Sequence, residues 1–196
     1  FGCVDRALAT VRELVEAPLS RPGVFAAVGV APPRGVLLHG APGCGKTSLA
    51  RAVAAETGAY FFIVNGAEIL SKQPGEAEAN LRKAFDAARA HTPAIVFLDE
   101  VDAVAPRRDS KGGSGGEERR VVRALCDLLD ELERDHAHAA VVVLAATNRA
   151  NAVHPALRRR RAASRTPNFS CPIVGQGTGR RVCRRRYGRL DREVDV

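Results

Sequence analysis

The residues with the most specific chemistry are a glycine-rich run that ends in a lysine and a threonine. The run Gly40-Ala41-Pro42-Gly43-Cys44-Gly45-Lys46-Thr47 fits the pattern GxxxxGK[ST]. Its glycines let backbone N–H groups turn inward around phosphate oxygens, and the following helix adds its positive N-terminus. Lys46 is placed to reach the β- and γ-phosphates, and the Thr47 hydroxyl to ligate Mg²⁺. The pattern predicts a nucleoside triphosphate site, against the alternative of a simple glycine-rich turn.

Two further polar groups follow apolar runs. Asp99 and Glu100 come directly after one such run, and Thr147-Asn148 follows another. Because ligands bind at the carboxyl ends of parallel strands, Asp99 is predicted to hold Mg²⁺ through water and Glu100 to polarise an attacking water. Asn148 is expected to orient that water. Taken alone, acids at a solvated strand end or an Asx turn would explain these residues equally well.

The elements that must position these groups alternate between two periods. Short apolar strands are predicted at 35–39, 60–64, 94–98 and 141–145, with a last strand-like stretch at 193–196. Helices are predicted at 5–17 (ending at Pro18), 46–56, 76–90 and 117–134. Apolar strands that alternate with helices indicate an α/β fold with a sheet covered on both faces. The expected architecture is a three-layer P-loop sandwich with a mostly parallel, five-stranded sheet.

Length and composition agree with one intracellular domain. The chain has 196 residues, 45% of them hydrophobic and 27% charged, which suits a single globular unit. No apolar run approaches the length of a membrane span, so no membrane insertion is expected. Five Cys without a CxxC pair favour a reducing compartment. The N-terminus has no initiator Met and no signal pattern, so we interpret the sequence as cut from a longer chain.

The net charge of +8 is concentrated in residues 160–186. That segment holds eight of the 30 Lys and Arg, which leaves 22 basic residues to face 22 acidic ones elsewhere. It shows neither helical nor strand periodicity. Three interpretations stay open: a retained intron or faulty gene model, a disordered surface loop, or a basic arm for nucleic acid or an acidic partner. Phe169 is the only aromatic residue in the segment, so stacking support for nucleic acid is poor, and no nucleic-acid partner is expected.

In combination, these motifs resemble the AAA ATPases. The resemblance rests on the run Pro33–Gly40 with the phosphate loop, and on Asn80–Phe85, Phe97–Ala103 and Ala145–Arg149. The strongest likeness is to the first ATPase domain of the Cdc48/valosin-containing protein group. It covers residues 1–159, as the large α/β subdomain, and 187–196, as the arginine-finger segment and last strand; 160–186 is an insertion between them. The helical lid that follows in that family is not expected within these 196 residues.

The resemblance implies a homo-hexameric ATPase that unfolds or extracts protein substrates, works with adaptor proteins and acts in the cytoplasm or the nucleus. ATP and Mg²⁺ are the implied ligands. Arg189 and Arg192 would reach the γ-phosphate in a neighbouring subunit, and Lys72–Gly75 falls on the pore loop, which has no aromatic residue. Thr47 and Asp99 are the implied metal residues. The residues implied to contact nucleotide are Gly2 (near adenine), Pro42, Gly43, Cys44, Gly45, Lys46, Thr47 and Ser48.

Two other functions stay open. A truncated nucleotide-binding fragment without motor activity is the first, because no lid is expected within this sequence and the insertion precedes the predicted arginine fingers. A P-loop enzyme of another kind, such as a GTPase or a small-molecule kinase, is the second. Such an enzyme would not need both Asn148 and the segment Gly188–Arg192.

Overall fold

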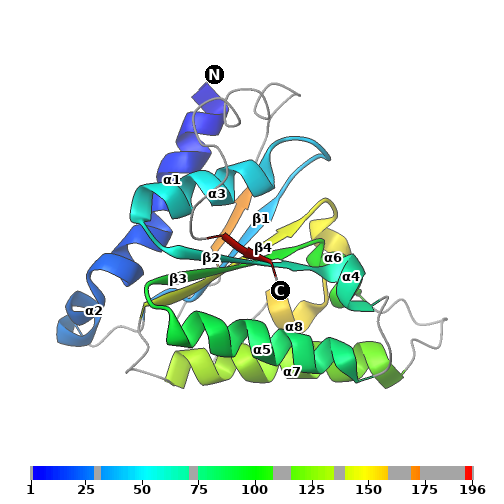
Figure 1. The fold of residues 1–196 in the computed structure, drawn as a ribbon. Helices are drawn as coiled ribbons and strands as arrows, with labels where there is room; N and C mark the ends of the chain where they lie inside the picture. The colour runs from blue at the N-terminus through cyan, green and yellow to red at the C-terminus, as the bar shows by residue number, and fades with distance from the viewer. Residues whose placement is uncertain are drawn as a thin grey trace.

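A computed structural model describes residues 2–28, 32–70, 75–107, 116–134, 140–158, 169–172 and 193–195. A twisted sheet forms the middle layer, with helices α1 and α3 on one face and α5 and α7 on the other (Figure 1). The predicted α/β three-layer sandwich is therefore confirmed. None of the helices within these ranges is long and apolar enough to cross a membrane.

The central strands alternate with helices along the chain, as predicted. The helices are α1 (Gly2–Ser20), α2 (Pro22–Val28), α3 (Lys46–Thr57), α4 (Gly66–Leu70), α5 (Glu76–Ala90), α6 (Val101–Val104), α7 (Gly116–Arg134), the 3-10 helix η1 (Ala150–Ala152) and α8 (Pro155–Arg158). The strands are β1 (Gly35–His39), β2 (Tyr60–Asn65), β3 (Ala94–Asp99), β4 (Val141–Thr147), β5 (Phe169–Pro172) and β6 (Glu193–Asp195).

The sheet has the strand order β5-β1-β4-β3-β2-β6, and each neighbouring pair is parallel. Four longer strands, β1 to β4, form its centre, and two short strands lie at the edges. The prediction of five strands is therefore wrong in number. The additional strand, β5, comes from the segment 160–186, in which no periodicity was detected. Four residues at a sheet edge need only backbone pairing, here with β1, and leave no pattern in the sequence.

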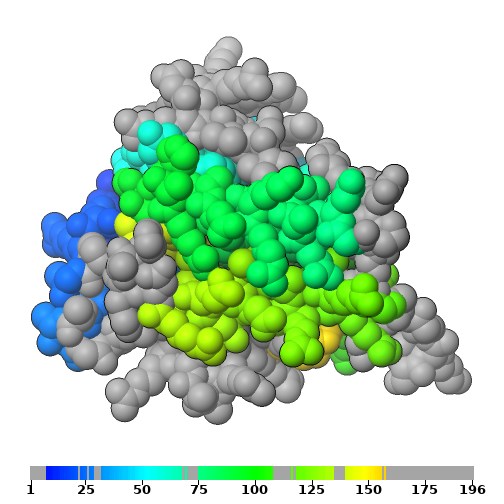
Figure 2. Space-filling view, turned by 60° about the horizontal axis from the view of Figure 1, so that its bottom comes forward, coloured from blue at the N-terminus to red at the C-terminus, as the bar shows by residue number. Residues whose placement is uncertain are grey.

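Alternate residues of the central strands enter two separate cores. On β3, Ile95 and Phe97 face the core under α1 and α3, whereas Val96 and Leu98 face the core under α5 and α7. The period of two along a strand explains this division. Both faces are apolar, which is why each central strand reads as a continuous hydrophobic run. Figure 2 shows α5 and α7 side by side as the outer surface of their layer.

The first helix extends further than its sequence suggested. The prediction ended it at Pro18, but α1 continues to Ser20 with Pro18 inside its last turn. A proline removes one backbone donor, and the turn is completed by the bond from Arg21 N to Ala17 O at 3.1 Å. Packing of Val15 and Leu19 into the core favours this longer helix.

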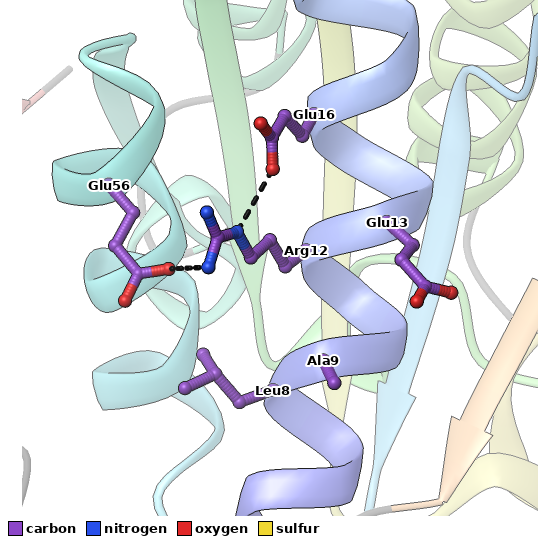
Figure 3. Close-up of a pocket in the computed structure, with 6 residues that line it drawn as sticks. All are labelled: Leu8, Ala9, Arg12, Glu13, Glu16 and Glu56. Atoms are coloured by element: carbon purple, nitrogen blue, oxygen red, sulfur yellow. Dashed lines mark hydrogen bonds and ion pairs between the residues drawn. The ribbon is translucent and has the colours of Figure 1, made fainter.

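A hollow of about 370 Å³ lies where α1 meets α3, away from the phosphate loop (Figure 3). Arg12 spans it and pairs with Glu16 at 2.9 Å and with Glu56 of α3 at 3.6 Å. The Arg12 side chain is 52% exposed, so these pairs contribute little to stability. They connect α1 to α3 at the surface, while apolar packing holds the two helices together.

Candidate nucleotide site

The polar groups singled out in the sequence meet at one edge of the sheet because of the strand order. β4 lies between β1 and β3, and β2 lies on the far side of β3. All four strands run parallel, so the loops after them emerge side by side. The phosphate loop follows β1, and Asn148 follows β4. Asp99 ends β3, and Glu100 comes directly after it. This edge is the crevice in which open parallel sheets bind ligands.

The phosphate loop has the backbone that its glycines predict. Gly43 and Gly45 have φ of 76° and 94°, in the left-handed region that side chains rarely adopt. Gly45 is the N-cap of α3, and no side chain caps that helix end. The first N–H groups of a helix have no partner within it, so they are available to an anion. Pro42 is exposed, Cys44 is buried, and Ser48 lies half-buried in the first turn of α3.

Lys46 is held at the centre of the site by three oxygens. Its Nζ donates to Gly40 O at 3.0 Å, to Ala41 O at 3.1 Å and to Asn148 Oδ1 at 2.7 Å. An ammonium group has three hydrogens, so each has an acceptor. The residue is only 8% exposed, which is unusual for a lysine. Its charge is therefore held inside the loop, between the loop carbonyls and Asn148.

Thr47 and Asp99 provide the oxygens that a magnesium ion prefers. Thr47 Oγ1 donates to Asp99 Oδ2 at 2.9 Å, which joins the start of α3 to the end of β3. Mg²⁺ bound with a nucleotide takes one or two protein oxygens and completes its shell with water and phosphate. This pair fits that requirement. Within the described ranges, no group of three or more His, Cys, Asp or Glu is placed to hold a metal.

Glu100 lies at a sharp corner between β3 and α6. It has φ of 52°, and it is the one described residue other than glycine with a positive φ. Its N–H donates to Asp99 Oδ1 at 3.0 Å, and its side chain is exposed. A strained corner of this kind is found where a side chain must be presented to a ligand. The carboxylate is thus free to face water at the edge that carries Asp99.

The corner is packed from behind by Gly66, the first residue of α4. A Cβ on Gly66 would lie 2.7 Å from Glu100 O, 2.7 Å from Val104 Cγ2 and 3.0 Å from Asp99 O. Only a residue without a side chain fits there. This role has no signal in the sequence, because Gly66 follows β2 and is remote in sequence from the residues that it contacts.

A second contact without a sequence signal joins β4 to α6. Thr147 Oγ1 donates to Asp102 Oδ1 at 2.7 Å and accepts from Arg149 N at 2.9 Å. Thr147 is 1% exposed. It precedes Asn148, whose own side chain contacts Lys46. The sequence suggested Asn148 as the active member of this pair and assigned no role to Thr147 or Asp102.

The arrangement is that of a phosphate-binding loop with a metal-binding carboxylate beside it, and comparison with protein families agrees. The model of the ATPase family associated with various cellular activities (AAA) matches residues 36–169, more than half of the chain. The chain belongs to the AAA family. Its members are nucleotide-binding ATPases that generally bind ATP and Mg²⁺. The matched region contains Lys46, Asp99 and Asn148, which the fold brings to one edge.

Some predicted residues of this AAA domain are not tested by the structure. Arg189 and Arg192 lie outside the described residues, as do Lys72–Pro74 of the predicted pore loop. Gly2 is the first residue of α1, and the side chains around it are also outside the described set. Their roles stay predictions from the resemblance.

Proposed function

We propose that this domain binds ATP with Mg²⁺ and hydrolyses the γ-phosphate bond. The observation that carries the proposal is the convergence of two pairs, Lys46 with Asn148 at 2.7 Å and Thr47 with Asp99 at 2.9 Å. Each pair links groups about 50 or 100 positions apart in sequence. A positive lysine, an amide and a magnesium-type oxygen pair at one sheet edge match what phosphoryl transfer requires.

In this mechanism Lys46 exchanges one of its oxygen acceptors for a phosphate oxygen. Its oxygen acceptors in this structure are two backbone carbonyls and the Asn148 amide oxygen, and Cys44 Sγ lies at 3.6 Å. A phosphate oxygen that takes the place of Asn148 leaves the ammonium fully bonded and releases the amide. Asn148 is then free to hold the attacking water. The buried ammonium keeps three hydrogen-bond acceptors before and after the exchange. This lowers the free-energy cost of keeping the charge buried.

Glu100 acts on the same water from the neighbouring strand end. Its exposed carboxylate is able to accept a hydrogen bond from water and polarise it toward phosphorus. Thr47 and Asp99 would hold Mg²⁺, which when bound neutralises phosphate charge. The backbone N–H groups at the start of α3 supply further positive potential. These contributions are electrostatic and positional, as expected for this reaction.

We further propose that the domain belongs to a Cdc48-like hexameric motor that remodels protein substrates with adaptor proteins. The similarity of its motifs to the first ATPase domain of that group supports this. Arg189 and Arg192 would then act on the γ-phosphate of a neighbouring subunit, so hydrolysis would depend on assembly. The proposed location is the cytoplasm or the nucleus. Neither nucleic acid nor membrane insertion is part of the proposal.

Phosphate release from ATP, measured together with sedimentation, tests both the proposed ATPase activity and the proposed hexameric motor. The wild-type chain should release phosphate with Mg²⁺, whereas Glu100→Gln should bind ATP and release almost none. A hexamer that forms with ATP would support the motor. Hydrolysis by a monomer would support the ATPase and contradict the motor. ATP binding without hydrolysis, whether the chain is a monomer or a hexamer, would favour the non-catalytic fragment.

A further inference from the structure

The bond between Thr147 and Asp102 lies at the point where the two catalytic strand ends meet. Thr147 is the last residue of β4, and Asp102 is in the first turn of α6, two residues after Glu100. The hydroxyl donates to the carboxylate at 2.7 Å, within the usual range for a hydrogen bond to a charged oxygen. At 1% exposure, the Thr147 side chain is shielded from competing water.

The same hydroxyl also shapes the turn that presents Asn148. It accepts from Arg149 N at 2.9 Å, so the residues on both sides of Asn148 are joined through one oxygen. This is a side-chain-closed turn of the kind that Ser and Thr form. Asn148 itself is exposed, and its side chain accepts from Lys46 Nζ at 2.7 Å. The turn closed by the Thr147 hydroxyl therefore sets the backbone from which Asn148 reaches Lys46.

The position of β4 in the sheet explains why the Thr147–Asp102 bond matters for the site. β4 is the one strand that neighbours both β1 and β3. Asn148 contacts Lys46, which lies in the loop and helix that follow β1. Thr147 contacts Asp102, which lies in the helix that follows β3. One turn thus joins the phosphate loop to the corner that carries Glu100. Errors of an ångström at a reacting centre cost up to ~100-fold in rate.

We propose that Thr147 and Asp102 are positioning residues, which fix Asn148 and Glu100 relative to each other. The proposal rests on the proposed ATPase function for its catalytic consequence. Neither residue needs to touch the nucleotide. Asp102 acts through α6 on the Glu100 corner, and Thr147 acts through its turn on Asn148.

The surrounding backbone keeps this region folded without the hydroxyl. Ala103 N donates to Glu100 O at 2.8 Å and His154 N to Ala105 O at 2.8 Å, while Pro106 and Val153 form an isolated bridge. The first contact closes the turn at the start of α6, and the other two connect the segments after β3 and β4 independently of Thr147. Removal of the hydroxyl should therefore disturb the side-chain geometry far more than the fold.

Kinetics of Thr147→Val, Thr147→Ser and Asp102→Asn test the proposal. Valine keeps the branched shape and removes the hydroxyl, so kcat should fall about 10- to 100-fold while ADP affinity stays within about twofold. Serine keeps the hydroxyl, and asparagine keeps an acceptor oxygen; both should retain kcat within about threefold. A wild-type kcat in Thr147→Val, or an equal loss in Thr147→Ser, would overturn the proposal.

A second readout needs neither nucleotide nor hydrolysis, and so separates this proposal from the proposed function. The Asn148 side-chain amide signal in the nucleotide-free protein is assigned by NMR through its loss in Asn148→Ala. Thr147→Val should shift or broaden that signal, because Asn148 loses its fixed direction toward Lys46. Thr147→Ser should leave it in place. An unchanged signal in Thr147→Val would refute the positioning role even if the protein hydrolyses no ATP.

Discussion

Replacement of Gly66 by alanine is the perturbation whose cost is best defined by the structure. The added Cβ would meet Glu100 O and Val104 Cγ2 at 2.7 Å, about 0.7 Å inside the 3.4 Å at which ordinary contact begins. One of these atoms is backbone, and the other belongs to a side chain that is 4% exposed, so neither can move aside freely. Overpacking of this kind costs ~1–3 kcal/mol.

Gly23→Ala is the matched control. Gly23 lies in α2, and a Cβ there would meet nothing within 4 Å. Both changes reduce the freedom of the unfolded chain by the same amount, a gain of ~0.4–1 kcal/mol. The difference between the two variants therefore isolates the contact at Gly66. In a domain of this size ~1 kcal/mol shifts Tm by ~2–4 °C, so Gly66→Ala should melt ~2–12 °C below Gly23→Ala.

Thermal unfolding followed by circular dichroism measures this difference. ATP hydrolysis should fall as well, because relief of the clash displaces the Glu100 corner. Equal Tm values for the two variants would show that the corner is not packed against Gly66. The role assigned to Gly66 would then be wrong.

Three further outcomes are expected. Phe97→Ala should lower the free energy of unfolding by ~3–5 kcal/mol in denaturant titration, because Phe97 is fully buried and stacks on Phe61 at 5.7 Å. Arg12→Ala should change it by less than ~1 kcal/mol, since both ion pairs of Arg12 are partly exposed; a larger loss would mean that these pairs hold α1 in place. Asn148→Ala should lower kcat about 10- to 100-fold and leave ADP affinity within about twofold, measured by phosphate release and fluorescence titration. An unchanged kcat in Asn148→Ala would remove that residue from the mechanism.

The fold could be predicted largely from local pattern. The central strands are buried on both faces, so each appears as an unbroken apolar run, and turns with glycine mark the ends of several elements. Gly58, for example, ends α3 with φ of 64°. The edge strand Phe169–Pro172 could not be predicted from the sequence, because it is defined by backbone pairing with β1. Pro18 predicts a helix end from its residue type, but core packing of Leu19 favours an α1 that continues to Ser20.

Residue types revealed the polar groups of the site but not the contacts that hold them. Lys46, Thr47 and Asp99 carry chemistry that follows from their side chains and their place beside an apolar strand. Gly66, Asp102 and Thr147 act only through neighbours that the strand order brings close. That order places β4 between β1 and β3 and is set by packing of the whole sheet. No local pattern contains it.

Equilibrium binding of ATP with Mg²⁺ to the wild type, Lys46→Ala and Glu100→Gln tests the central claim most directly. A charge-assisted hydrogen bond is worth ~1.5–3 kcal/mol, so Lys46→Ala should weaken ATP binding by at least ~10-fold. Glu100→Gln should bind within about twofold of the wild type, because Glu100 acts on water and not on the bound phosphates. Equal affinities for the wild type and Lys46→Ala would contradict the assignment of this edge as the nucleotide site.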